Sequence, residues 1–99
     1  YLDIAAPENS VISAVLDGTV IAAGWNDETG FTIQVQHSND LVSIYRHCSK
    51  LLKKSGDRVK AGTALALVGN TGKLSTGSHL HFELWHKGRA VNPEQYIVF

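Results

Sequence analysis

The sequence lacks several features that would mark particular classes of protein. Its single cysteine, Cys48, cannot form an internal disulfide, and we interpret it as a small buried hydrophobe. Neither sign of charge is in excess, because nine Lys plus Arg balance nine Asp plus Glu. This balance argues against a nucleic-acid-binding surface. No apolar run approaches the roughly 20 residues that cross a bilayer, so we expect no membrane-embedded segment in this chain.

The start of the chain also lacks a signal peptide. Tyr1 leads straight into an apolar stretch, and we expect a piece cut from a longer precursor whose targeting signal lies upstream. The sequence contains no internal repeat, low-complexity tract or linker. Its 99 residues, 43% of them hydrophobic and 18% charged, suit one small globular domain over residues 1–99.

Short apolar runs separated by turn residues predict an all-β fold. Asp17-Gly18 lies between the runs 11–16 and 19–23, and this dipeptide is typical of a tight hairpin. Phe31, Ile33 and Val35 alternate with polar residues, as in a half-buried strand. Other runs predict strands, with turns between them, at 41–45, 65–68 and 79–85. We therefore predict a compact antiparallel β-sandwich or partly open barrel.

The sequence His79-Leu80-His81 is the most informative local motif. On a strand, alternate side chains share a face, so His79, His81 and Glu83 should point one way. Two imidazoles and a carboxylate on one face can form a zinc site, since catalytic zinc usually has three protein ligands and a water. His-x-His is short, however, and taken alone it is more often part of a solvated polar strand face.

The loop before this motif favours a functional site. Residues 69–78 include three glycines, and their only large apolar residue is Leu74. A glycine-rich loop lets the backbone approach a substrate closely. It is also longer than the roughly 4–6 residues of an ordinary connection.

The run 69–84, GNTGKLSTGSHLHFEL, resembles the C-terminal signature of lysostaphin-type (LytM-like) zinc endopeptidases, "G-x-T-G-x-S-T-G-P-H-L-H-F-E". It departs from that signature by one extra residue, Leu74 being the expected insertion, and by Ser78 in place of Pro. Other segments resemble the family in the same order, namely LDGTVIAAGW (16–25), IYRHCS (44–49), GDRVKAG (56–62) and VNP (91–93). The resemblance therefore covers essentially the whole chain and implies the barrel-sandwich hybrid fold of these peptidases.

The resemblance also implies roles for individual residues. Asp3, in the run LDIAAP (2–7), and His81 correspond to zinc ligands, while His47 and His79 correspond to catalytic histidines. The family's remaining ligand is a histidine four positions before this aspartate, which would lie upstream of Tyr1. The family's glycine is replaced by Tyr1. With two of three ligands in these 99 residues, we expect the isolated chain to be poorly active.

The remaining candidates have simpler interpretations. Glu83 either orients a histidine as a hydrogen-bond acceptor or pairs with a cross-strand Lys or Arg. We expect His37 to be a solvated turn residue and His86 to be exposed on the face away from His79. Trp25 and Tyr45 could line a substrate groove, although aromatic residues in small β domains more often belong to the core.

Three functions are compatible with these observations. The resemblance favours a zinc endopeptidase that cleaves peptide cross-links of bacterial peptidoglycan, in the periplasm or outside the cell. A non-catalytic relative that binds the cell wall or regulates a partner hydrolase is the alternative. A biotinyl- or lipoyl-type carrier is a weaker third possibility, because GDRVKAG (56–62) also resembles part of that fold, but no lysine at a hairpin tip is evident.

Overall fold

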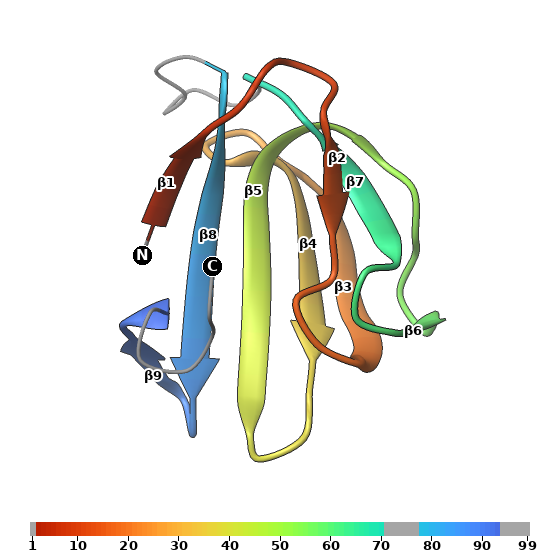
Figure 1. Cartoon of the computed structure of the whole chain (residues 1–99), viewed down its shortest axis with the longest axis vertical. Helices are drawn as coiled ribbons and strands as arrows, with labels where there is room; N and C mark the ends of the chain where they lie inside the picture. Colours follow the sequence, from red (N-terminus) through yellow and green to blue (C-terminus); the bar gives the residue numbers. More distant parts are fainter. Residues whose placement is uncertain (1, 71–77, 94–99) are drawn as a thin grey trace.

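A computed structural model describes residues 2–70 and 78–93, which form nine strands of one sheet (Figure 1). The strands follow one another along the chain as β1 (Leu2–Ala5), β2 (Val11–Ser13), β3 (Gly18–Asn26), β4 (Gly30–Gln36), β5 (Leu41–Leu51), β6 (Arg58–Val59), β7 (Ala64–Val68), β8 (His79–His86) and β9 (Arg89–Val91). The described residues are thus dominated by β-structure, as the alternating apolar pattern predicts.

The sheet is antiparallel and curls around the long strand β5. Its order is β1-β8-β5-β4-β3-β6, with β7 joining β5, β2 joining β7, and β9 joining β8. β5 pairs with β4 and β8 along most of its length and with β7 only near its end, where Cys48 lies opposite Val68. Figure 1 shows β2 and β7 lying across the curl from β1 and β8. This half-barrel confirms the predicted partly open barrel.

The inside of the curl is the hydrophobic core. Ile33 and Val35 of β4 are fully buried, which confirms the alternation predicted for this strand. Tyr45 of β5 packs against Phe82 of β8, with 5.3 Å between the ring centroids, so the aromatic residue Tyr45 belongs to the core. Cys48 is also fully buried, as expected.

The hairpin predicted at Asp17-Gly18 is wrong. β2 pairs with β7, and β3 pairs with β4 and β6, so the runs on either side of this dipeptide are not partners. Asp17 instead accepts a hydrogen bond from the Ala61 amide through Oδ1, at 2.7 Å. A Cβ at position 18 would collide with the Gln36 carbonyl and lie 2.9 Å from Nδ1 of His37. Glycine is therefore needed at position 18 for close strand packing rather than for a tight turn.

Short turns join the remaining antiparallel neighbours along the chain. β3 and β4 are joined at residues 27–29, and β4 and β5 at residues 37–40. Lys87 and Gly88 both have positive φ, 52° and 78°, which suits the two-residue hairpin between β8 and β9. Most of the polar run 69–78, including the expected insertion at Leu74, lies outside the described residues.

The expectation of a solvated His37 is also wrong. This side chain is only 5% exposed. Its Nδ1 lies 2.8 Å from the Asp17 carbonyl and its Nε2 lies 2.7 Å from Oγ of Ser43, which in turn lies 2.8 Å from the Tyr45 hydroxyl. The turn composition around His37 predicts an exposed side chain. In the structure the ring is buried instead, and both of its nitrogens have hydrogen-bond partners, Asp17 and Ser43.

Candidate metal and catalytic site

The predicted face of β8 is present in the structure. Phe82 and Leu84 are each 1% exposed and point into the core. His79, His81 and Glu83 alternate with them and are partly buried on the opposite face, as strand parity predicts. One strand therefore supplies both the core and three polar side chains of the candidate site.

His47 reaches this face because β5 contains a bulge. Tyr45 lies opposite Ile33 and Cys48 opposite Phe31, so Arg46 and His47 together face the single residue Thr32. His47 has a φ of 61°, and its amide donates to the Thr29 carbonyl at 2.8 Å. The extra residue returns Cys48 to the core side. Without it, parity would place His47 on the core face with Tyr45.

The bulge brings three histidines together from two strands. The ring centroid of His47 lies 6.1 Å from that of His79 and 5.8 Å from that of His81. His47 is itself only 5% exposed. His47 and His79, for which the family resemblance implies a shared role, are thus neighbours in the structure. Imidazoles at this spacing can bind a metal or exchange protons with a substrate held between them.

Asp3 lies beside the same cluster in the backbone register. β1 pairs with β8 so that Asp3 is directly opposite His81. The side chain of Asp3 is outside what the structure describes. Among the described side chains, no group of three His, Cys, Asp or Glu residues could hold a metal ion. The chemistry of the set still suits zinc, because imidazole nitrogens and an aspartate oxygen are ordinary zinc donors.

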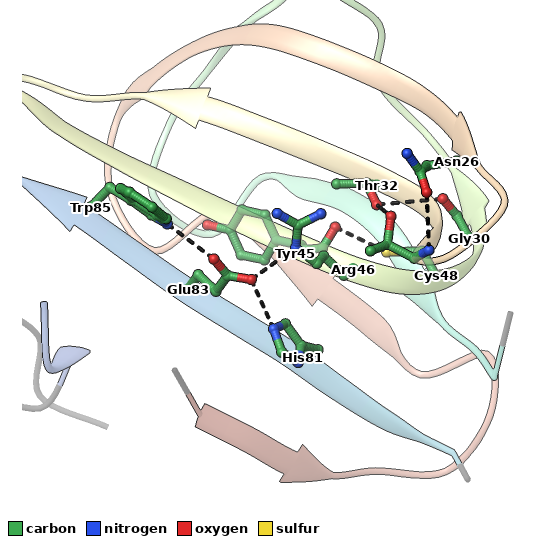
Figure 2. Close-up of polar contacts among 10 residues, drawn as sticks. Asn26, Gly30, Thr32, Tyr45, Arg46, Cys48, His81, Glu83 and Trp85 are labelled. Carbon is green, nitrogen blue, oxygen red and sulfur yellow. Dashed lines mark hydrogen bonds and ion pairs between the residues drawn. The ribbon is translucent and has the colours of Figure 1, made fainter. Parts of the chain in front are cut away.

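Glu83 binds three neighbours through its carboxylate (Figure 2). Oε2 accepts hydrogen bonds from Nε of Arg46 and Nε2 of His81, both at 2.8 Å, and Oε1 accepts one from Nε1 of Trp85 at 3.0 Å. Burial by itself raises the pKa of Glu83, but the hydrogen bonds from Trp85, Arg46 and His81 and the charge of Arg46 lower that pKa below its usual value. Glu83 therefore contacts both a histidine and a cross-strand arginine, the two kinds of partner that the sequence left open.

A groove adjoins the site on the β3–β4 side. It has a volume of about 300 Å³ and is lined by residues of the β3–β4 hairpin and by Arg46. Trp25, on its wall, is 54% exposed and meets Phe31 edge-on at 5.0 Å. A larger cavity of about 430 Å³ lies between Gly18, Ser38 and Arg58, and none of the site histidines lines it. The sequence assigns Arg46 no role, because its contact with Glu83 depends on the pairing of β5 with β8.

Comparisons with known proteins give consistent matches in sequence and in structure. The profile of peptidase family M23 matches residues 2–93. Over 98 residues the chain is 40% identical to the murein hydrolase activator NlpD of Escherichia coli, covering 97% of this chain and 25% of that protein. Over 90 residues it is 39% identical to the peptidoglycan DD-endopeptidase ShyA of Vibrio cholerae, covering 91% of this chain and 21% of that protein. The chain thus spans about a quarter or less of these curated relatives.

Solved structures give the same result. A zinc-containing peptidase from Vibrio cholerae superposes with a TM-score of 0.86 at 37% identity, over 90% of this chain and 27% of that one. The catalytic domain of the antimicrobial peptidase lysostaphin from Staphylococcus simulans superposes with a TM-score of 0.83 at 30% identity, over 92% of this chain and 72% of that one. Within the described residues, no helix is long and apolar enough to cross a membrane.

Proposed function

The chain belongs to peptidase family M23, and we propose that it forms the core of a zinc-dependent endopeptidase that hydrolyses peptide cross-links of bacterial peptidoglycan. The observation that carries this proposal is the convergence of His47, His79 and His81 beside the backbone of Asp3. Relatives named as a peptidoglycan endopeptidase and as a zinc-containing peptidase support the substrate and the metal. A bacterial cell-envelope location, periplasmic or extracellular, belongs to the same proposal.

Asp3 and His81 are the proposed zinc ligands in this chain. A third protein ligand, the histidine expected four positions before Asp3, would belong to the segment upstream of Tyr1, so residues 1–99 would be one domain without its first ligand. Bound zinc would supply a Lewis acid that polarises the scissile carbonyl and activates a water molecule. One carboxylate and two neutral imidazoles would make three protein ligands, the usual number for a catalytic zinc, and would leave a position open to a reacting group.

His47 and His79 would manage protons and charge. Each ring is close enough to the His81 strand face to reach a peptide lying across it. One imidazole can accept a proton from the attacking water, and another can donate a hydrogen bond to the oxygen on which negative charge develops. The groove lined by Trp25, Thr32 and Arg46 would hold the peptide next to these groups.

The test is the zinc content of the full-length natural protein, measured by elemental analysis together with digestion of purified peptidoglycan. We expect about one zinc per molecule and release of cross-linked peptides, with both lost in Asp3→Ala and His81→Ala. His86→Ala, on the opposite face of β8 by parity, is the matched control and should retain both. A folded wild-type protein without zinc, or full hydrolysis by His81→Ala, would contradict the proposal.

One observation favours a second candidate function. A relative at 40% identity is named a murein hydrolase activator, so this chain could instead bind and regulate a partner hydrolase in the cell envelope. In that case the groove would bind the wall or a partner protein, and substitution of His47, His79 or His81 would leave that activity intact. Retained activation of a hydrolase by a triple histidine variant, with no peptide release by wild-type protein, would favour this candidate.

A further inference from the structure

Glu83 is placed to control the chemical form of His81. Its two oxygens accept three hydrogen bonds, two of them from side chains of its own strand, His81 and Trp85, and one from Arg46 on β5. These partners lie on one face because 81, 83 and 85 alternate along β8, and because Arg46 is opposite His81 in the strand pairing. The Glu83 side chain is 17% exposed and that of His81 is 16% exposed, so bulk water competes little with these contacts.

The contact with Glu83 decides which nitrogen of His81 carries a proton. An ionised carboxylate only accepts hydrogen bonds, so Nε2 of His81 must donate. In a neutral imidazole the other nitrogen then carries the lone pair, which is the form a metal requires. Figure 2 shows this second ring nitrogen on the side of His81 turned away from Glu83.

We propose that Glu83 is the positioning residue of the metal-binding histidine, holding His81 with its proton on Nε2 so that Nδ1 is the nitrogen presented to zinc. The inference rests on the proposed function, because it concerns the same metal. It extends that proposal by naming the ligating atom and the residue that selects it. Carboxylate partners of this kind orient ligand histidines and raise their basicity.

Arg46 and Trp85 act on His81 through Glu83. With Nε of Arg46 on Oε2 and Nε1 of Trp85 on Oε1, the carboxylate has little freedom to rotate. A plain cross-strand ion pair would explain the contact with Arg46, but it would not require two further donors from β8. Since both oxygens are already engaged with protein donors, Glu83 is better suited to hold a ligand than to be one.

The experiment measures the tautomer of His81 in metal-free, full-length protein labelled with 15N-histidine, and then its zinc affinity. In the wild type we expect a proton on Nε2 and a lone pair on Nδ1. In Glu83→Gln the neutral amide oxygen is a weaker acceptor than the carboxylate, so a smaller fraction of His81 should carry its proton on Nε2, and zinc should bind roughly 10- to 100-fold more weakly. Arg46→Gln removes the ion pair but keeps the acceptor, and should leave the tautomer unchanged with a smaller loss of affinity.

The outcomes separate this inference from the function on which it rests. A wild-type ring protonated on Nδ1 would overturn the inference without any variant, even if Glu83→Gln fails to fold. Equal zinc affinity and an unchanged tautomer in folded Glu83→Gln would also overturn it, while the zinc enzyme itself stood. A wild-type protein that binds no zinc would overturn the proposed function and the metal part of the inference, whatever the tautomer.

Discussion

The imidazole rings of His47 and His81 meet edge-on, with 5.8 Å between their centroids, although it is Arg46 that lies opposite His81 in the strand pairing. The bulge in β5 is the cause, because its additional residue turns His47 out of the core and toward β8. The site therefore depends on a left-handed backbone at a residue other than glycine.

The backbone at His47 should discriminate between two small substitutions. Both His47→Gly and His47→Ala remove the imidazole, and both should abolish the proposed peptide hydrolysis in the full-length protein. Glycine adopts a φ near 61° without the steric cost that alanine incurs, so His47→Gly should be more stable than His47→Ala by about 1 kcal/mol. Urea denaturation of the two variants measures this difference. An alanine variant at least as stable as the glycine variant would contradict the assigned bulge.

Gly69 and Gly24 form a matched pair for a test of packing. A Cβ at Gly69 would collide with the Ser49 amide and lie 2.8 Å from the Cys48 carbonyl carbon, just beyond the bulge. Gly69→Ala should therefore lower the free energy of unfolding by about 1–3 kcal/mol. A Cβ at Gly24 meets nothing within 4 Å, so Gly24→Ala should leave stability unchanged or raise it by up to about 1 kcal/mol. Equal effects in thermal or urea denaturation would refute the predicted contrast.

Ser43 is the central member of the buried polar chain from His37 to Tyr45. Ser43→Ala removes the oxygen that contacts both Nε2 of His37 and the Tyr45 hydroxyl, leaving two buried polar groups without that partner. We expect a loss of about 1–3 kcal/mol in the free energy of unfolding. Ser10→Ala is the control, because its hydroxyl contacts the Pro7 carbonyl at the surface, and it should change stability by no more than about 0.5 kcal/mol.

Cys48 should be chemically inert in the folded protein. Burial raises the pKa of its thiol to about 12, so at pH 8 the reactive thiolate is nearly absent. Iodoacetamide should label the denatured chain at pH 8 but not the native one. An unfolded thiol ionises above about pH 8.5. Between that pH and about 12 the unfolded state therefore loses its proton first, and Cys48 should make the fold less stable as the pH rises. Rapid stoichiometric labelling of native protein would disprove this burial.

Local alternation predicted most strands correctly, because the pattern of Ile33 and Val35 depends only on which face is buried. It could not predict strand partners. Asp17-Gly18 has the composition of a hairpin turn. Position 18 nevertheless requires glycine for another reason, because the Gln36 carbonyl at the end of β4 leaves no room for a Cβ. His37 was misjudged for the same reason, since its partners Asp17 and Ser43 meet it only after folding.

In the candidate site, too, local alternation predicts some features, while others depend on strand pairing. Parity on β8 placed His79, His81 and Glu83 on one face without any structure. The contribution of His47 could not be derived in this way, because the bulge breaks the alternation that such reasoning uses. The triple contact of Glu83 was equally hidden, since Arg46 comes from another strand and is brought into reach by sheet pairing.

The alternation of β8 makes the packing of the core and the position of the histidines depend on the same strand register. If β8 slipped by one residue against β5, Phe82 and Leu84 would turn to water, while His81 and Glu83 would enter the apolar interior. A misaligned strand would thus lose its hydrophobic packing and its histidines in the same step. Chains that pair this strand incorrectly should therefore be unstable, rather than persist as folded copies that lack the histidine cluster.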